Sequence, residues 1–304
     1  MSARVWGALG LASLGWGSAG IATRAALSEG LGPYEITAVR SVIAAAAVAV
    51  LLAIGRGRLR VGRRRWRLGL VLGSTNMAIP FVLTTLAVQH ASAGFVGLLV
   101  ANIPVGTALW ANWLLPEERL TVWKATGLAV SVAGILVLMA GGDSGLGDEG
   151  NPVLAVALAT LGLACASYGS VHVKRHAPDL GALDLAGPQF VVGAAIMIPL
   201  MAVAEGGPTA GAAGWGLLVY LGLVGTVVPF SLFYWALQSV SATEASLVGY
   251  VVPVVGVLGG VLLLSEHVTP AIAVGGLLII TGVAVTQRAA HVAPHPAPGA
   301  AAER

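Results

Sequence analysis

The sequence predicts an all-α integral membrane protein in which ten transmembrane helices form two inverted five-helix repeats. Composition, the spacing of apolar segments and an internal repeat support this fold class. Of the 304 residues, 57% are hydrophobic and only 10% are charged, and the mean hydropathy is +0.89. A soluble protein of this size needs more polar surface than these residues supply, so we expect the chain in a lipid bilayer.

Charged, Gly-rich and Pro-rich breaks divide the chain into ten apolar segments. About 20 apolar residues cross the hydrocarbon core of a bilayer, and each segment should be helical because lipid offers no partners to backbone polar groups. The expected spans are 4–27, 34–54, 66–88, 93–115, 121–140, 152–173, 182–204, 214–237, 242–264 and 270–288. The connections are short, so no soluble domain is expected. The Ala- and Pro-rich tail at 289–304 is expected to be disordered.

Basic residues gather at one end of the predicted bundle. The connection between the second and third spans contains GRGRLRVGRRRWR, with seven arginines, whereas the connections at the other end contain no Lys or Arg. Because Lys and Arg collect on the cytoplasmic side, we expect both termini in the cytoplasm, the linker 141–151 outside it, and the protein in the cell (inner) membrane. A basic run between two spans is typical of a topology signal beside anionic lipids, so no nucleic-acid partner is expected.

One stretch of sequence occurs twice, 149 residues apart. IPFVLTTLAVQHASA (79–93) matches VPFSLFYWALQSVSA (228–242). The same offset gives further identities, among them Gly73 with Gly222, Pro104 with Pro253 and Glu117 with Glu266. We therefore expect one five-helix repeat at 1–140 and a second at 152–288. Because five is odd, the repeats should lie in opposite orientations, an arrangement found in secondary transporters that open one site to alternate sides.

The end of each predicted repeat has the same build. A Leu-rich span, a Glu, a short loop and a Gly-spaced helix occur in WLLPEERLTVWKATGLAVSVAGILVL (113–138) and in LLLSEHVTPAIAVGGLLIITGVAV (262–285). Together with LGWGSAGIATRAAL in the first span and EITAVRSVIAAAA in the second, these stretches resemble EamA-type members of the drug/metabolite transporter superfamily. The resemblance covers all but the tail. It implies a ten-helix bundle around a central cavity that moves small metabolites, often amino acids or toxic analogues, outward.

The expected function is the export of small metabolites such as amino acids or related toxic compounds. The alternatives are a sugar-phosphate or nucleotide-sugar carrier or a metabolite importer of the same superfamily, and a non-transport membrane scaffold. The sequence has no Walker loop, HExxH motif or soluble catalytic domain, so we expect the protein not to be an enzyme and to need no cofactor or metal. The expected partners are a small-molecule substrate and membrane lipids. Ala- and Gly-rich helix faces permit close packing within one molecule or in a homodimer.

Polar residues near the centres of spans are candidates for substrate contact, because polar groups in mid-membrane usually face a cavity. Asn102 and Pro104 lie in the fourth span, and Tyr250 and Pro253 lie at the matching depth of the ninth. Each proline frees the carbonyl four residues earlier, which would make a polar site near the axis between the repeats. The alternative is that the prolines only kink the helices and Asn102 bonds to a neighbouring helix.

Arg40 lies about 9 Å into the second span, and its counterpart at the 149-residue offset is Gln189. An arginine at this depth needs a carboxylate, either from a substrate or from Glu35 at the edge of the same span. Two hypotheses therefore stand, substrate contact and structural pairing or gating.

Further cavity candidates are Asn76 in the third span, Trp16 in the first, Tyr168 in the sixth and Tyr234 in the eighth. Trp16 and Tyr168 occupy corresponding places in LGWG and ASYG, and an aromatic pair there would suit an apolar or aromatic substrate.

Glu117 and Glu266, at junctions between spans, are expected to accept backbone N–H bonds at the next helix start, where negative charge is favoured. A direct role in transport is the alternative. No Asp or Glu lies in mid-membrane, which leaves facilitated diffusion, counterion exchange, or proton carriage by His90 or His172.

Overall fold

A computed structural model describes residues 3–54, 62–116, 118–147, 150–240, 245 and 248–292. Of residues 248–250 and 288–292 it describes the backbone only. Much of the arginine-rich connection, Glu117, the start of the ninth expected span and most of the tail lie outside these residues.

The described chain is helical and contains no strand. Its α-helices and π-helical turns (η) are α1 (Ala3–Ser28), α2 (Pro33–Ile54), α3 (Arg63–Leu72), η1 (Gly73–Ala78), α4 (Ile79–His90), α5 (Ala93–Val100), α6 (Ile103–Leu114), α7 (Val122–Ala140), α8 (Pro152–His176), α9 (Ala182–Glu205), α10 (Ala212–Gly222), η3 (Leu223–Val227), α11 (Val228–Leu237), α13 (Val248–Leu264) and α14 (Pro270–Val292).

Within the described residues, nine helical spans are long and apolar enough to cross a membrane. Three of them are composite, since α3, η1 and α4 form one, α5 and α6 another, and α10, η3 and α11 a third. A tenth apolar helix, α13, is shorter, with 17 residues. The prediction of an all-helical, multi-pass membrane protein is confirmed. The last helix continues to Val292, beyond its expected end at 288.

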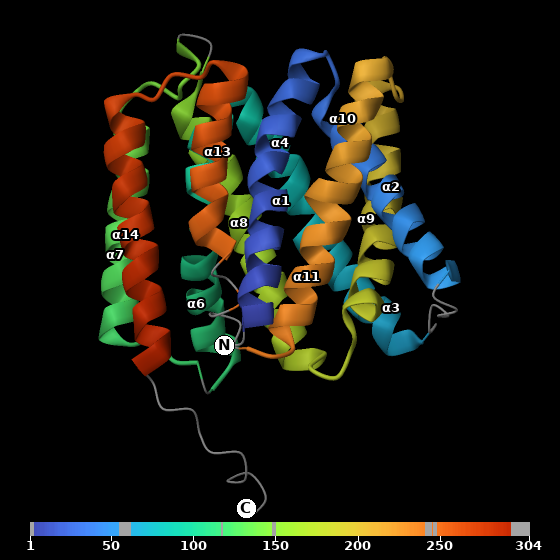
Figure 1. Cartoon of the computed structure of the whole chain (residues 1–304), viewed down its shortest axis with the longest axis horizontal. Helices are drawn as coiled ribbons and strands as arrows, with labels where there is room; N and C mark the ends of the chain where they lie inside the picture. The colour runs from blue at the N-terminus through green and yellow to red at the C-terminus, as the bar shows by residue number, and fades with distance from the viewer. Residues whose placement is uncertain are drawn as a thin grey trace, which may run out of the picture.

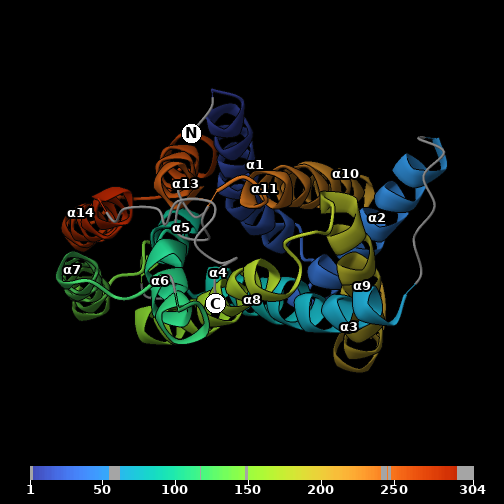
Figure 2. The ribbon, with the colours of Figure 1, turned by 90° about the horizontal axis from the view of Figure 1, so that it is seen from below.

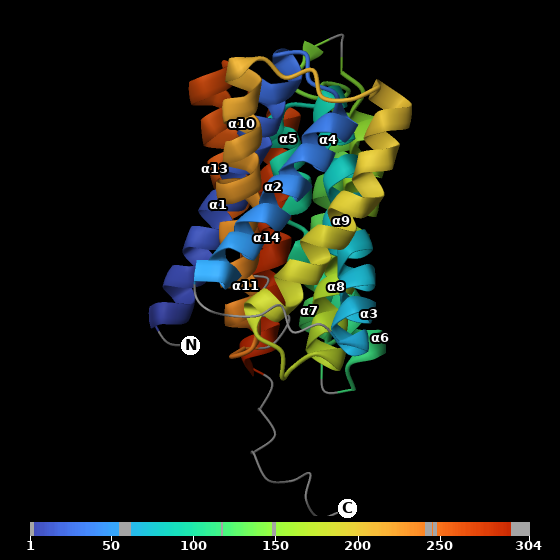
Figure 3. The same cartoon turned by 90° about the vertical axis from the view of Figure 1, so that its right-hand side faces the viewer.

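The helices stand side by side in one bundle (Figure 1). Seen from one end, α13, α1, α11 and α10 follow one another along one side, and α6, α8 and α3 along the other (Figure 2). α7 and α14 pack together at one edge, whereas α2 and α9 lie at the opposite edge. α1 begins and α14 ends at the same end of the bundle, as Figure 3 shows from the side.

Glycines allow α7 and α14 to approach each other closely. A Cβ atom added to Gly134 would lie 2.7 Å from the carbonyl oxygen of Gly275, and one added to Gly275 would lie 2.9 Å from the carbonyl oxygen of Gly134. Small residues let helix backbones meet in this way in membranes. The glycine spacing seen in the sequence therefore serves this pairing.

The π-helical turns interrupt two spans at related places. η1 precedes Pro80 and η3 precedes Pro229, and these prolines are 149 residues apart. A proline has no N–H and its ring displaces the carbonyl four residues earlier, so the turn before it widens. The N–H of Ile79 consequently bonds to the carbonyl of Ser74, five residues back, and Val228 bonds in the same way. Such turns are frequent at functional sites.

Carboxylates tie helix starts to distant parts of the chain. Glu266 accepts the backbone N–H of Ala93 at 2.7 Å and that of Gly94 at 3.2 Å, at the start of α5. The next helix along the chain, α14, has its own cap, because the Thr269 hydroxyl accepts the N–H of Ile272 at 3.2 Å. Glu266 thus joins the loop before α14 to the first half of the chain.

A similar exchange joins α2 to the α9–α10 connection. Glu205 accepts the N–H groups of Tyr34 and Glu35, at 3.0 and 2.6 Å. The Glu35 carboxylate in turn accepts the N–H groups of Thr209 and Ala210, at 2.8 and 3.0 Å, and the Thr209 hydroxyl. Glu35 is therefore occupied by the α9–α10 connection and makes no ion pair with Arg40.

Candidate functional site

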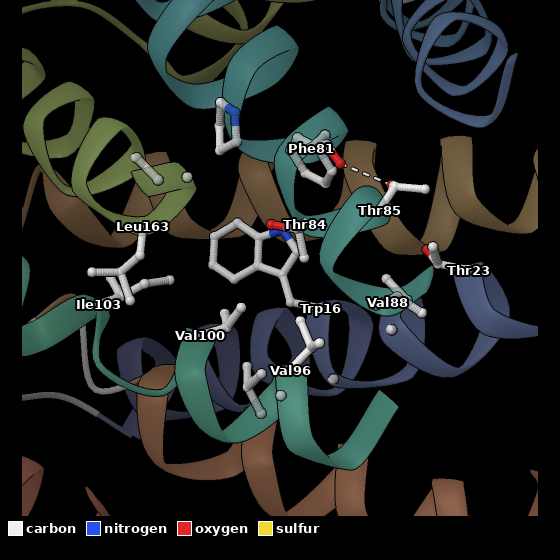
Figure 4. A pocket seen from close by; sticks show the side chains of 18 of the residues that line it. Trp16, Thr23, Phe81, Thr84, Thr85, Val88, Val96, Val100, Ile103 and Leu163 are labelled. Carbon is white, nitrogen blue, oxygen red and sulfur yellow. Dashed lines mark hydrogen bonds between the residues drawn. The ribbon is translucent and has the colours of Figure 1, made fainter. Parts of the chain in front are cut away.

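The described helices surround a cavity to which both halves of the chain contribute (Figure 4). About 1120 Å³ of its space is not filled by protein atoms, including the part that opens to solvent. Its walls come from α1, α2, η1, α4, α5 and α6 in the first half and from α8, α11 and α13 in the second. A mostly apolar cavity lined by both halves of the chain suits a small organic molecule.

Arg40 is the charged group of this cavity. Its side chain is only 2% exposed, and it lines the cavity from α2. Its Nε and Nη2 atoms donate to the Thr226 hydroxyl at 3.1 and 2.9 Å, and Nη2 also donates to the carbonyl of Gly225 at 3.1 Å. The guanidinium carbon lies 4.1 Å from the centre of the Phe81 ring. No described residue accepts a hydrogen bond from Nη1, and no described carboxylate pairs with Arg40.

The partners of Arg40 come from the π-helical turn that Pro229 imposes. Because Pro229 offers no N–H to the carbonyl of Gly225, that carbonyl is available to the guanidinium. The Thr226 hydroxyl donates its proton to Leu221 at 2.8 Å, so it faces Arg40 as an acceptor. These bonds are neutral, and burying an ion without a counter-charge costs several kcal/mol. The arginine therefore remains short of an anion.

Aromatic rings form one wall of the cavity. Trp16 makes edge-on contacts with Phe230 and Phe233, with ring centres 5.3 and 5.5 Å apart, and Phe81 lies 6.1 Å from Phe230. In Figure 4 the Trp16 ring lies among the lining residues, between Val100 and Thr84. This wall offers a large apolar surface beside the arginine.

A second polar cluster adjoins the cavity through Asn76. The Asn76 side-chain amide donates to the Tyr234 hydroxyl at 3.1 Å, and Tyr234 donates to Oε1 of Gln189. All three are buried, and Asn76 alone lines the cavity. The fold thus brings together three residues that the sequence nominated separately.

The polar site that was predicted at the centres of the fourth and ninth spans differs from the cavity. Asn102 is buried at the break between α5 and α6, and its amide donates to the carbonyls of Leu98 and Leu99 at 3.3 Å. Neither Asn102 nor Pro104 nor Pro253 lines the cavity. The bonds of Asn102 stay within its own span, so they are neither substrate contacts nor links to another helix in this structure.

Tyr250 lies in α13 with only its backbone described, and Glu117 lies outside the described residues. The roles expected for these two side chains stay predictions.

Tyr168 faces away from the cavity. Ala166 and Ser170 of α8 line it, and residues two apart on a helix point in different directions. Tyr168 packs instead against Trp110 of α6, with ring centres 5.2 Å apart, and its hydroxyl lies 3.4 Å from Nδ1 of His172. Trp16 and Tyr168 therefore do not form a pair, because their helices turn them toward different neighbours.

The sequence analysis did not identify Phe81, Thr226 or the two α11 phenylalanines, Phe230 and Phe233, as site residues. A signal for this turn was present in the sequence. Pro229 predicts a freed carbonyl at Gly225, next to Thr226, by the same rule that was applied to Pro104 and Pro253. Phe81 and Phe230 were visible as an identity at the 149-residue offset.

Comparison with known proteins agrees with this architecture. The model of the EamA-like transporter family matches residues 6–140 and again 153–288. A probable terminal-alkyne amino-acid exporter of Streptantibioticus cattleyicolor is 32% identical over 295 residues, which cover 95% of this chain and 94% of that protein. The uncharacterized transporter YoaV of Bacillus subtilis is 25% identical over 88% of this chain and 91% of its own.

A solved crystal structure is similar with a TM-score of 0.67 and 23% identity, covering 93% of this chain and 96% of its own. This likeness supports the fold alone. The helical membrane bundle, its cavity and these relatives define a multi-pass membrane transporter. More narrowly, the chain belongs to the EamA-like transporter family, so the resemblance found in the sequence is confirmed.

Proposed function

We propose that this protein is a secondary transporter that exports small metabolites, such as amino acids or related toxic compounds, across the inner membrane by alternating access. The observation that carries the proposal is the cavity between the two halves of the chain, in which the buried Arg40 has no anionic partner among the described residues. A relative that covers nearly the whole chain is named a probable exporter of an amino acid, which supports the direction and the class of substrate.

Alternating access follows from two inverted repeats, at 1–140 and 152–288, joined by the linker 141–151. The double match of one family model and the two π-helical turns before Pro80 and Pro229 support this division. Two halves of the same build in opposite orientations can exchange conformations, which opens one site to each side in turn.

Both termini are proposed to lie in the cytoplasm, because the arginines at the start of α3 are at the end of the bundle where α1 begins. Single cysteines at Asp143→Cys and Arg63→Cys test this, after Cys165→Ala removes the native thiol. An impermeant maleimide added to whole cells should label the first variant and not the second. Reversed labelling would overturn the orientation.

A sugar-phosphate or nucleotide-sugar carrier is less well supported by the cavity. Such substrates carry two or more negative charges, whereas Arg40 is the one cationic side chain among the described lining residues. Arg24, on α1, donates to the carbonyl of Val88 at 3.1 Å and does not line the cavity.

Export is tested by mass spectrometry of the medium around bacteria that express the protein. The variant Thr84→Trp fills the cavity, and Leu262→Trp, at a side chain 77% exposed on α13, is the matched control. A metabolite should accumulate outside with the wild type and with Leu262→Trp, and not with Thr84→Trp at equal membrane abundance. Accumulation with all three proteins would remove the cavity from the transport path.

A further inference from the structure

We infer that the cavity selects substrates of net charge −1, in which a carboxylate is attached to an apolar or aromatic body and any nitrogen is uncharged. The inference rests on the proposed function, because it takes the cavity as the place where substrate binds. Within the proposed class of amino acids and related compounds, it selects the monoanionic members, such as N-acylated amino acids and hydrophobic carboxylic acids, over the zwitterionic ones.

The charge of the cavity wall is the first step. Among the described lining residues, Arg40 is cationic and no Asp or Glu is present. An arginine keeps its charge in proteins. The carboxylates of Glu35, Glu205 and Glu266 are bound to backbone N–H groups and do not line the cavity. The empty site therefore carries an uncompensated positive charge, which one carboxylate would neutralise.

The shape of the arginine site fits a carboxylate. Thr226 and Gly225 hold Nε and Nη2, and the Phe81 ring supports the flat face of the guanidinium. These contacts fix the plane of the group and leave Nη1 without an acceptor among the described residues. A carboxylate can accept from such a preorganised edge, since guanidinium and carboxylate match in geometry.

A substrate ammonium finds no anion in this cavity. The Thr85 hydroxyl donates to its own helix, at the Phe81 carbonyl, over 2.8 Å, and the Ser170 hydroxyl does the same at Ala166 over 3.0 Å. Thr23 and Thr84 offer neutral hydroxyls only. An aromatic face attracts a cation weakly when compared with the cost of removing an ammonium ion from water. A zwitterion would therefore neutralise Arg40 and leave its own cation unpaired.

The rest of the substrate meets the aromatic wall. Trp16, Phe230 and Phe233 line the cavity and supply an aromatic surface in it. A flat or branched apolar body can cover these rings and exclude water from the ion pair, which strengthens the pair.

Four ligands on one body test the inference with the purified full chain. They are N-acetylphenylalanine (charge −1), phenylalanine (zwitterion), N-acetylphenylalaninamide (neutral) and phenylalaninamide (cation). Binding is measured by microscale thermophoresis and by counterflow in proteoliposomes. We expect N-acetylphenylalanine to bind about tenfold or more tightly than phenylalanine, and both amides to bind more weakly still.

Substitutions of arginines supply the controls. Arg40→Gln should bring the affinities for N-acetylphenylalanine and N-acetylphenylalaninamide to within a factor of about two, while Arg24→Gln should keep the preference for the anion. Arg40→Lys retains the charge and guards against a folding defect in Arg40→Gln, and it should keep part of the preference. Equal binding of phenylalanine and its N-acetyl form, or an unchanged preference in Arg40→Gln, would overturn the inference.

The outcome also separates this inference from the proposed function. If the four ligands fail to bind while the cavity-dependent export of a cellular metabolite persists, the substrate class is wrong and the transporter stands. If export also fails, the proposed function falls with it.

Discussion

Arg40 and Gln189 occupy positions 149 residues apart, on α2 and α9, and each is buried close to a π-helical turn that precedes a proline. Arg40 bonds directly to η3 and contacts the cavity. The Gln189 side chain is linked by hydrogen bonds to η1 through Tyr234, which bonds to both Gln189 and Asn76, and it does not line the cavity.

The difference shows how one backbone plan can give two kinds of site. In both places a proline forces a wide turn and a polar side chain from a neighbouring helix bonds near it. Where the side chain is charged, the cluster remains incomplete and can take an anion. Where it is neutral, Tyr234 links Asn76 to Gln189 and so joins η1, α9 and α11, while Oδ1 of Asn76 and Nε2 of Gln189 have no hydrogen-bond partner among the described residues.

The largest effect should come from making the two places alike with Gln189→Arg. The new guanidinium would have no counter-charge and no cavity beside it, and an uncompensated buried charge costs about 3–5 kcal/mol. We expect a large loss of folded protein, measured as the melting temperature in detergent and the yield of monodisperse protein. A variant as stable as the wild type would show that the Gln189 cluster is open to solvent or ligand.

Removing the tyrosine hydroxyl that links Asn76 to Gln189 should have a smaller effect. Tyr234→Phe leaves the Asn76 amide and the Gln189 carbonyl without a shared partner, which costs about 1–3 kcal/mol for buried groups. Binding of N-acetylphenylalanine should change little, because Tyr234 does not line the cavity.

Tyr220→Phe is the matched control for that change. The Tyr220 hydroxyl makes one hydrogen bond, to Ser18 at 2.8 Å, in a partly exposed place. Its loss should lower the melting temperature less than Tyr234→Phe does. The reverse order would contradict the view that Tyr234 is a structural link.

The helix starts near the two sites give a finer comparison. Glu35 and Asp184 are also 149 residues apart. Glu35 is buried and accepts two backbone N–H groups and a hydroxyl, whereas Asp184 makes a partly exposed ion pair with Arg65 at 3.1 Å. Glu35→Gln should lower the free energy of unfolding by about 1–2 kcal/mol, and Asp184→Asn should lower it by under about 1 kcal/mol. Equal melting temperatures for the two variants would remove this difference between the halves.

The smallest effect is expected at the ion pair between Arg64 of α3 and Asp179 of the α8–α9 connection. Arg64 donates to both carboxylate oxygens, at 2.8 and 2.7 Å, and this bonding lowers the pKa of Asp179 from its usual 3.8. A lowered carboxyl pKa adds stability above the usual value, and that stability is lost as the pH falls through the lowered one. The group is exposed, so the melting temperatures of wild type and Asp179→Asn should differ slightly at pH 7 and converge as the pH falls through the lowered pKa of Asp179. A difference that grows on acidification would reverse this assignment.

Much of the fold could be predicted because the bilayer imposes simple rules. Apolar length and the need to satisfy backbone hydrogen bonds locally give the number and approximate limits of the helices. The π-helical turns were not predicted as such, but Pro80 and Pro229 mark their positions, since a missing N–H acts on the turn just before it.

The site was harder to predict because side-chain direction depends on helix rotation. By their depth in the membrane, Asn102, Trp16 and Tyr168 were equally good candidates for the cavity wall. The rotation of each helix decides which of them lines it, and only Trp16 does. Trp16 points into the cavity, Asn102 bonds within its own span, and Tyr168 turns toward α6. Arg40 was identifiable because a buried charge is rare at any rotation.

By itself, the sequence determined that the chain is a bundle of membrane helices with related halves and a buried arginine, since these features follow from composition, periodicity and a repeated pattern. Only the tertiary structure decided the partners of Arg40. Glu35, five residues away, bonds to the connection between α9 and α10, while Thr226 and Gly225, far along the chain, hold the guanidinium. Contacts between distant segments depend on how helices pack and rotate, and neither property is encoded in a local pattern.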